Sequence, residues 1–387
     1  MIKTVLIATL FLAVTILGNS QENYKEIVNV DNHYTAGEQY DVQELGKVKF
    51  KRKPKNVILL IGDGMGHNQV FAGYTANGGK LHLQNCTHFG LVNTKSANKY
   101  TTDSAAGGTA LACGKKTLNG AVGVDTEGNA LPNIREKSEL VGKSTGVVST
   151  SSITHATPAS FMAHQPKRSM YEAIANDFLN TNVDVFIGGG KKHFTEREDG
   201  ANLVDSLKLK GYQVLEQIDE MTQVTEGKLA GLTAWEHNVS VTDGRGEMLT
   251  KATQTAINIL DNNKDGFFLM VEGSQIDWAG HQNSTSYLVT EMLDFDKAVG
   301  AALAFAAENR ETLVIVTADH ETGGFAIKNG SFDEGKVEGM FATKGHTGVF
   351  VPLFAYGPGA EHFTGIIENV DIPTKIAELF GTQLTVE

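Results

Sequence analysis

The chain is poor in cysteine and in proline, with two Cys and seven Pro among 387 residues. Two cysteines cannot form a disulfide framework, which excludes the class of small disulfide-stabilised domains. Cys86 and Cys113 are expected to be two buried thiols, although a single bridge between them stays open. Positive charge is also scarce, because 33 Lys and Arg face 45 Asp and Glu for a net charge of −12. No nucleic-acid-binding surface is therefore expected, and the acidic side chains are available as cation ligands.

Long hydrophobic runs are missing too, since a membrane helix needs ~20 apolar residues. An uncharged run of 13 residues, Val5 to Leu17, follows Lys3 near the N-terminus. Small residues come next, so the pattern predicts a signal peptide over 1–20 with cleavage before Gln21. We therefore expect a periplasmic or secreted protein with no membrane span after signal removal. A polar segment, 21–55, follows and ends in a basic cluster, which we expect to be solvated.

From Asn56 onward, short apolar runs alternate with helical patterns, of which 247–260 and 284–308 are the clearest. Such alternation predicts an α/β fold with a mostly parallel central sheet sandwiched between helices. No internal repeat or flexible linker divides the chain, so 56–387 is expected to be a single domain. The predicted strands are 57–61, 146–150, 184–187, 267–271, 312–317 and 353–356.

Carboxylate and imidazole groups follow three of these strands, at the edge where ligands of open α/β sheets bind. Asp277 and His281 are four residues apart, which puts them on one face of a helical turn. The adjacent pair Asp319 and His320 can hold one ion only from an irregular loop. Mixed nitrogen and oxygen ligands suit zinc, whereas oxygen ligands such as Asp63 suit magnesium. Several such ions together favour two-metal catalysis.

A nucleophile for such a site is offered by Ser104, which stands in the stretch Thr-Thr-Asp-Ser-Ala-Ala-Gly-Gly. The small residues after Ser104 can begin a helix whose free N–H groups face a bound phosphate. The alternative interpretation is a helix cap with no chemical role. No Gly-x-Ser-x-Gly motif surrounds Ser104, which disfavours a Ser-His-Asp triad.

With these motifs the sequence resembles the alkaline phosphatase family, from about Asn56 to about Leu379. Six short motifs in the family order carry the resemblance. They begin at Asp63 (DGMG), Thr102 (TDSA), Thr154 (THATPA), Glu272 (EGSQID), Ala318 (ADHETGG) and Gly345 (GHT).

The resemblance implies the alkaline phosphatase fold, two Zn²⁺ ions and one Mg²⁺ ion. It also implies hydrolysis of small-molecule phosphomonoesters through a phosphoserine at Ser104, with inorganic phosphate as a product inhibitor. Arg168 stands eleven residues after Thr157, at the family's spacing for an arginine that binds phosphate oxygens. The implied metal ligands are Asp277, His281 and His346 for one zinc, Asp63, Asp319 and His320 for the second, and Asp63, Thr157 and Glu272 for magnesium.

Two positions depart from the best-known bacterial pattern and resemble the marine and cold-adapted branch. His155 and Trp278 stand where that pattern has an aspartate and a lysine. Both are expected beside the site, where they either pack or tune magnesium binding and water access. The segment between His320 and His346 is short, so dimer contacts cannot be carried over from relatives with a large insertion there. A homodimer is possible.

Three alternatives to a monoesterase differ from it in their sequence signals. A phosphodiesterase of the same superfamily typically has a threonine nucleophile and lacks the arginine and the magnesium triad. A sulfatase is disfavoured because no Cys or Ser stands in a C/S-x-P-x-R context. A non-catalytic secreted protein that binds phosphate or metal would be favoured by loss of a ligand or of the nucleophile, and all of them are present.

Overall fold

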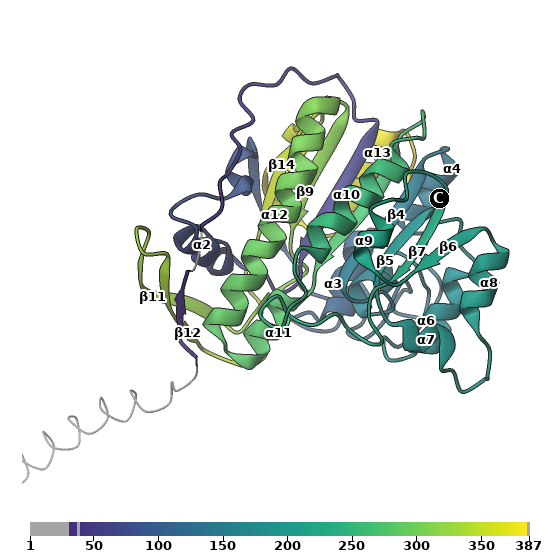
Figure 1. The fold of residues 1–387 in the computed structure, drawn as a ribbon, viewed down its shortest axis with the longest axis horizontal. Helices are drawn as coiled ribbons and strands as arrows, with labels where there is room; N and C mark the ends of the chain where they lie inside the picture. Colours follow the sequence, from purple (N-terminus) through teal and green to yellow (C-terminus); the bar gives the residue numbers. More distant parts are fainter. Residues whose placement is uncertain (1–30, 37–38, 385–387) are drawn as a thin grey trace, which may run out of the picture.

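The computed structural model describes residues 31–36 and 39–384, so the signal peptide predicted over 1–20 lies outside the described residues. A ten-stranded sheet runs through the middle of the molecule (Figure 1). From one edge to the other, its strands are β15 (Gly365–Glu368), β3 (His88–Asn93), β14 (Val351–Tyr356), β9 (Thr312–Thr317), β2 (Asn56–Gly62), β8 (Phe267–Gly273), β4 (Ser144–Ser152), β5 (Val185–Gly189), β7 (Lys228–Leu232) and β6 (Tyr212–Leu215).

All neighbouring strands of this sheet are parallel except at β14, which runs antiparallel to both β3 and β9. At the centre, Leu59 of β2 lies between Met270 of β8 and Ile315 of β9. Every residue of these three strands is buried, as expected for a parallel sheet that is covered on both faces. The predicted fold class is confirmed.

Helices cover both faces of the sheet. On one face, α10 and α12 pack against each other and against the central strands, in front of the sheet in Figure 1. On the other face, α3, α4, α5 and α13 form a second contacting layer. The helices are α2 (His67–Ala76), α3 (Ser104–Cys113), α4 (Ile134–Leu140), α5 (Ala156–Ser160), α6 (Tyr171–Phe178), α7 (Lys191–Thr195), α8 (Leu203–Leu209), α9 (Ile218–Met221), α10 (Met248–Leu260), α11 (Gln275–Gln282), α12 (Thr285–Asn309) and α13 (Asp371–Phe380), with short 3-10 turns η1 (His82–Asn85) and η2 (Ala360–His362).

The longest of these helices, α12, has clear sequence signals at both ends. The Ser284 side chain caps its N-terminus by accepting a hydrogen bond from the backbone of Tyr287, and Arg310 ends it in the left-handed conformation. Leu288, Met292 and Phe295 follow at helical spacing and are fully buried. This apolar stripe holds α12 against the sheet.

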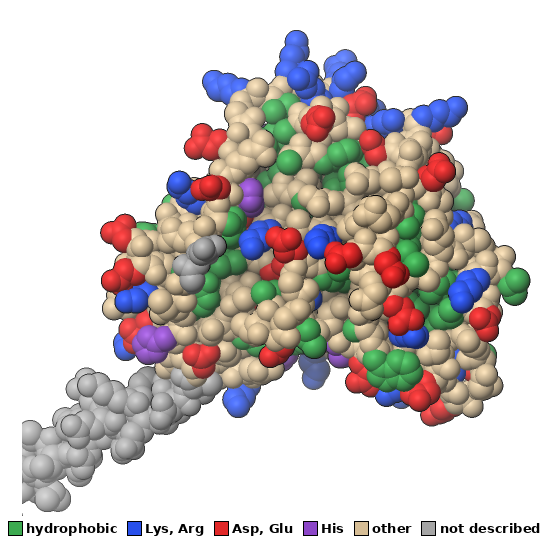
Figure 2. All heavy atoms as spheres, in the orientation of Figure 1, with side chains coloured by type: hydrophobic (Ala, Val, Ile, Leu, Met, Phe, Trp, Pro, Cys, Tyr) green, Lys and Arg blue, Asp and Glu red, His purple; other side chains and the backbone are tan. Residues whose placement is uncertain are grey.

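The segment before β2 is packed against the domain by its apolar and aromatic side chains. β1 (His33–Thr35) pairs with β12 (Lys336–Phe341), which pairs with β11 (Phe325–Ser331). The Tyr40 hydroxyl donates to Asp296 at 2.6 Å, and Phe50 packs edge-on against Tyr356. The lysines and the arginine at 47–53 are exposed, as predicted, and blue side chains gather at the top of Figure 2, above the arch that leads to β2.

The two cysteines are buried and unpaired, which confirms the expectation of two thiols. Cys113 ends α3, and Cys86 follows η1. Burial raises the pKa of both thiols above the usual range, with smaller contributions from Asp296 at Cys86 and from Glu136 at Cys113. Neither thiol therefore has the exposed thiolate character of a reactive cysteine.

Candidate active site

Except for His346, which precedes the antiparallel strand β14, the predicted ligands follow the carboxyl ends of four adjacent strands, in the order β9, β2, β8 and β4. Asp63 follows β2 directly, and Asp319 and His320 follow β9 in an irregular turn. β8 leads into α11, while β4 leads into the turn that carries His155 and then into α5. Because the strands are parallel, these four connections meet at one edge.

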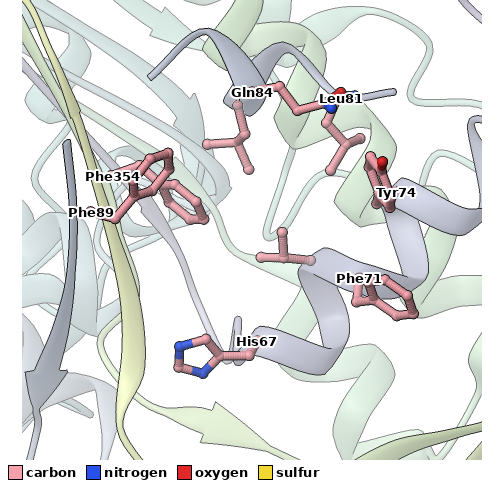
Figure 3. A pocket seen from close by; sticks show the side chains of 9 residues that line it. His67, Phe71, Tyr74, Leu81, Gln84, Phe89 and Phe354 are labelled. Carbon is pink, nitrogen blue, oxygen red and sulfur yellow. Dashed lines mark hydrogen bonds between the residues drawn. The ribbon is translucent and has the colours of Figure 1, made fainter. Parts of the chain in front are cut away.

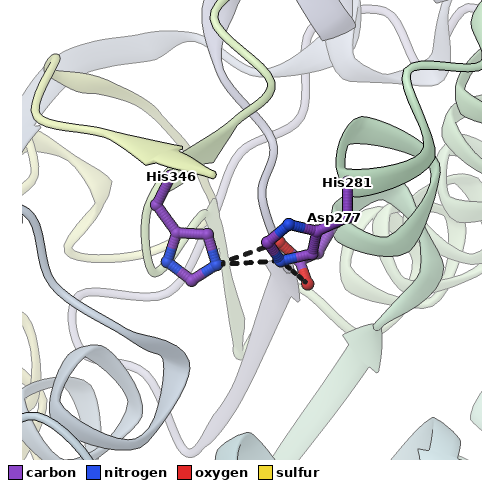
Figure 4. A group of neighbouring side chains, drawn as sticks. All are labelled: Asp277, His281 and His346. Atoms are coloured by element: carbon purple, nitrogen blue, oxygen red, sulfur yellow. Dashed lines mark hydrogen bonds and ion pairs between the residues drawn. The ribbon is translucent and has the colours of Figure 1, made fainter. Parts of the chain in front are cut away.

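The first cluster joins Asp277, His281 and His346 (Figure 4). One turn of α11 places His281 Nε2 at 3.3 Å from Asp277, and His346, in the short strand β13 (His346–Thr347), lies 3.4 Å from the same carboxylate. The two imidazole Nε2 atoms are 3.2 Å apart. The hydrogen bond to Asp277 raises the pKa of His281 to about 9. Burial raises the pKa of Asp277, but the hydrogen bonds from both histidines outweigh it and leave that pKa well below the usual range.

The second cluster surrounds His320, whose ring is completely buried. Its Nε2 lies 3.4 Å from Asp63 and 3.3 Å from Asp319. Asp277 also lies within reach of the Asp63 and His320 ligand atoms. Burial, together with the charge of Asp277, raises the pKa of Asp319 to about 7. Burial and the nearby His346 lower the pKa of His320 far below its usual range, so this imidazole is neutral and has a lone pair for a cation.

The third cluster is made of Asp63, Glu272 and a ring nitrogen of His155, all buried. Ser149 donates a hydrogen bond of 2.6 Å to one Glu272 oxygen. The other Glu272 oxygen has no hydrogen-bond partner among the described residues, and the same holds for the Thr157 hydroxyl, which is also fully buried. Burial raises the pKa of Glu272.

These clusters fit metal ions because they hold buried oxygens that nothing else satisfies. Both carboxylate oxygens of Asp63 and one of Asp319 lack a hydrogen-bond partner within the described part of the chain. Burial and the charge of Asp319 raise the pKa of Asp63 well above its usual range. Unpaired buried carboxylates cost several kcal/mol or more, and divalent cations remove that cost. Asp63 belongs to two of the clusters, so its carboxylate would be shared between them.

Ser104 is the first residue of α3 and is only 2% exposed. Its hydroxyl lies 3.2 Å from Nε2 of His320, at the centre of the ligand clusters. The cap of α3 is Asp103, whose side chain accepts from the backbone of Ala106. The interpretation of Ser104 as a mere helix cap is therefore wrong, because its neighbour has that role.

Two glycines in α3 allow this close approach. A Cβ on Gly107 would lie 3.0 Å from the backbone oxygen of Asp319, and one on Gly108 would lie 2.9 Å from the Ser160 hydroxyl. Glycine inside a helix costs about 1 kcal/mol relative to alanine. Because these two positions have no side chain, α3 packs directly on the turn that holds Asp319.

Arg168 points back to the site from the loop before α6. Its guanidinium is 3.3 Å from Asp103 and donates to Nε2 of His155 at 3.1 Å. Burial and the Arg168 charge lower the pKa of His155 to about 3, which keeps the imidazole neutral and able to accept. Trp278, half-buried, follows Asp277 in α11, and its ring lies edge-on to His155 with a centroid distance of 6.1 Å.

Two further residues complete the arrangement although sequence reasoning assigned them no role. Asp103 holds Arg168 while it caps α3. The Thr322 hydroxyl donates to Asp277 and lies 3.2 Å from Nδ1 of His320, so it links two ligands of different clusters. Asp103 stands in the TDSA motif and Thr322 in the ADHETGG motif. Their place inside these motifs is the sequence feature that points to a role for them.

Comparisons with known proteins agree with this geometry. The family model described as alkaline phosphatase matches residues 54–337. Alkaline phosphatase 4 of Bacillus subtilis is 35% identical, over 88% of this chain and 93% of its own length, and the Escherichia coli enzyme is 31% identical over 82% and 84%. The chain belongs to the alkaline phosphatase family. Its activity, accordingly, is phosphomonoester hydrolysis.

Solved structures of alkaline phosphatases have the same fold. The alkaline phosphatase of the Antarctic bacterium TAB5 superposes with a TM-score of 0.81 at 42% identity, over 85% of this chain and 99% of that one. A histidine-to-aspartate variant of the TAB5 enzyme has Mg bound in its M3 site. The family is metal-dependent, and the three ligand clusters are where this chain would hold metal. Among its described residues, no helix is long and apolar enough to cross a membrane.

The close approach of α3 leads to a test. Replacing Gly107 with Ala favours the helix intrinsically but pushes a methyl group against the backbone of Asp319, which cannot rotate away. We expect Gly107→Ala to lower phosphomonoesterase activity at least tenfold, on the order of 1.4 kcal/mol, with reduced metal content by elemental analysis. Full activity and full metal content would contradict this prediction, because they would show that the turn at Asp319 moves aside without affecting the site.

Proposed function

We propose that the chain hydrolyses phosphomonoesters through a covalent phosphoserine at Ser104, in a site that holds two Zn²⁺ ions and one Mg²⁺ ion. The observation that supports this most is the 3.2 Å contact between the Ser104 hydroxyl and His320, within a group of buried carboxylates that lack partners. A nucleophile at this place lies among side chains that would hold metal cations, which can activate its hydroxyl.

The proposed metal ligands follow the clusters and the chemistry of their donors. Mixed nitrogen and oxygen donors suit zinc, and an oxygen set with a hydroxyl suits magnesium. When bound, such ions act as Lewis acids that favour the deprotonated serine and stabilise the leaving oxygen. The proposed sets are Asp277, His281 and His346 for one zinc, Asp63, Asp319 and His320 for the other, and Asp63, Thr157 and Glu272 for magnesium.

The chain's own residues then carry the two displacements. In the first, the Ser104 oxygen bonds to phosphorus, the ester oxygen leaves and is protonated to the alcohol, and the serine proton goes to solvent. In the second, water attacks phosphorus, the bond to Ser104 breaks, and the serine regains a proton as inorganic phosphate is released. Arg168 holds two nonbridging oxygens in both steps, because its planar fork matches them and Asp103 orients it.

His155 and Trp278 are proposed to adjust this site without touching the reacting atoms. His155 lies between Arg168 and the magnesium cluster, where a neutral imidazole neither repels phosphate nor balances the guanidinium. Trp278 offers one N–H donor and no charge, where a lysine would attract the anion. Product phosphate should therefore be held less tightly than with an aspartate and a lysine at these places.

Export completes the proposal. Residues 1–20 are proposed as a signal peptide, with 21–55 as a polar N-terminal segment and 56–387 as the catalytic domain. The protein would act in the periplasm or outside the cell, on small phosphomonoesters that diffuse to it.

Replacing the nucleophile tests the covalent step. Ser104→Ala should lower kcat by at least about a thousandfold, because the covalent route is lost while water attack stays possible. Zinc and magnesium contents should stay normal, because the hydroxyl is not among the proposed ligands. Turnover above about half of the parent value would exclude the phosphoserine route.

Metal removal tests the ligand assignment. A strong chelator should abolish activity, and zinc with magnesium should restore it better than either metal alone, since the clusters differ in donor type. Glu272→Gln should lose magnesium and keep two zinc ions per chain by elemental analysis. Restoration by magnesium alone would contradict the two-zinc proposal.

Removing the guanidinium tests phosphate binding. Arg168→Ser should raise both KM and the inhibition constant for inorganic phosphate at least tenfold, about 1.4 kcal/mol, because one bidentate charged contact is lost in both complexes. Arg52→Ser, at an exposed arginine far along the chain, is the matched control. An unchanged phosphate inhibition constant would remove Arg168 from the site.

A homodimer is proposed as well, through a groove of about 480 Å³ between α2, the η1 turn and the strands β3 and β14 (Figure 3). No charged side chain lines it, and Phe71 and Phe89 on its opposite sides are 49% and 56% exposed. The same patch thus contains both a groove and exposed aromatic rings. In a two-fold contact, the rings of each copy would fill the groove of the other copy. An apolar patch of this kind is typical of an interface.

Light scattering tests this contact. The parent protein should have twice the mass of the chain, and Phe71→Arg should give active monomers because it puts a charge into an apolar contact. Leu209→Arg, at an exposed leucine of α8 beside the opposite edge of the sheet, is the control and should stay dimeric. A monomeric parent, or a Phe71→Arg dimer, would contradict the proposal.

A further inference from the structure

The loop between β7 and α10 places an imidazole, His237, beside the site. Its ring packs edge-on against Trp278, with centroids 4.8 Å apart, and lies 5.6 Å from the ring of His155. The three rings differ in exposure: His155 is 9% exposed, Trp278 is half-buried and His237 is exposed. They form a wall that leads from Arg168, which contacts His155, out to solvent.

The orientation of the His237 ring is fixed by the backbone. The amide of Ser152 donates to its Nδ1 at 3.0 Å. An amide N–H can only donate, so Nδ1 carries the lone pair and the ring cannot flip without losing this bond. No described residue forms a hydrogen bond with Nε2 at the outer side of the ring.

Buried polar contacts fix the loop on the side of α11 and α12. The Gln275 side chain at the start of α11 donates to the backbone oxygen of Asn238 at 2.8 Å. Glu291 of α12 accepts from the backbone of Val241, and Arg245 forms buried ion pairs with Glu291 and with Asp294.

The loop is also held on the side of β5. A Cβ on Gly189 would lie 2.3 Å from the backbone oxygen of Glu236, so only glycine permits this approach. The backbone of Gly190 donates to Ala234 at 3.0 Å. A free surface loop does not require so many buried contacts. In this loop they hold the His237 ring at one place beside Trp278.

An in-line displacement at Ser104 sets the direction in which the alcohol part of a bound ester extends. Ser104 lies at the bottom of the site with 2% exposure, and an in-line displacement puts the leaving oxygen on the side of phosphorus opposite the serine. The alcohol part therefore extends toward solvent. The rings of Trp278 and His237 both pack on His155, which contacts the arginine proposed to hold the phosphate.

We propose that His237, with Trp278, forms the side wall for the alcohol part of the substrate and selects phosphomonoesters whose alcohol carries a flat ring. The inference rests on the proposed phosphomonoesterase function. His237 contacts the part of the substrate that leaves, so it determines specificity and takes no part in bond breaking. Stacking of a base on an aromatic side chain gives an effect large enough to measure.

The test compares two substrates that lose phosphate from the same 5′ oxygen, adenosine 5′-monophosphate and ribose 5-phosphate. For the parent, kcat/KM should be roughly fivefold higher for the adenosine ester, about 1 kcal/mol. His237→Ala should remove this preference, with less than a twofold change for ribose 5-phosphate and for phosphate inhibition. Trp235→Ala is the matched control, on the same loop and 48% exposed, and should keep the preference.

A second measurement needs no variant. The parent should prefer uridine 5′-monophosphate to its dihydrouridine analogue by at least about threefold, because saturation of the base removes the flat ring and leaves the size nearly unchanged. Equal values of kcat/KM for the two members of each substrate pair would overturn the proposal of a specificity wall. An equal loss of kcat/KM with adenosine 5′-monophosphate and ribose 5-phosphate in His237→Ala would overturn it too. Failure of the parent to hydrolyse any monoester would instead overturn the proposed function.

Discussion

Burial of carboxylates without counter-charge is the constraint on which the rest of the site depends. Asp63, Glu272 and Asp319 have no exposed surface, and four of their six oxygens lack a hydrogen-bond partner among the described residues. Burial raises the pKa values of all three groups, so positive charge is needed nearby to keep them ionised together. Such groups stay together only if the structure around them is rigid. A parallel sheet that is buried on both faces provides this rigid support.

The same constraint accounts for the unusual packing nearby. α3 carries two consecutive glycines so that its first turn can reach the buried ligands, at the expense of helix stability. The Ser149 and Thr322 hydroxyls each donate to a carboxylate at the site. The glycines lower the stability of the helix, and the hydroxyl groups add little stability of their own. Both kinds of feature keep the buried carboxylates of the site close together.

The centre of the sheet could be predicted from the sequence, whereas its edges could not. The runs at 57–61, 267–271 and 312–317 are continuous and apolar, because their strands are buried on both faces. β3 and β15 alternate or face solvent and contain glycine, and β6 has only four residues, so they lack that signal. The reversed direction of β14 is likewise invisible in its composition, since direction depends on the path of the chain before it.

In the site, the residues that stand directly after strands were recognisable, and the ones that hold them were not. Asp63 and Asp319 follow apolar runs, and Asp277 and His281 have helical spacing. Asp103 looked like part of a serine motif, because its contact with Arg168 joins residues that are 65 positions apart. His237 sits in an irregular loop with no pattern around it, and its neighbour Trp278 is 41 positions away. Contacts of this kind depend on tertiary structure alone.

The reversed strand β14 also decides how His346 reaches the cluster that contains Asp277 and His281. Parallel strands deliver the residues that follow them to this edge, but an antiparallel strand delivers the residues that precede it. The chain therefore leaves β9 at the edge that carries the ligand clusters and returns to the same edge before β14. The whole excursion from Asp319 to Phe350 thus begins and ends at that edge. An insertion in this excursion would lengthen the chain beside the ligand clusters without shifting a strand of the ten-stranded sheet.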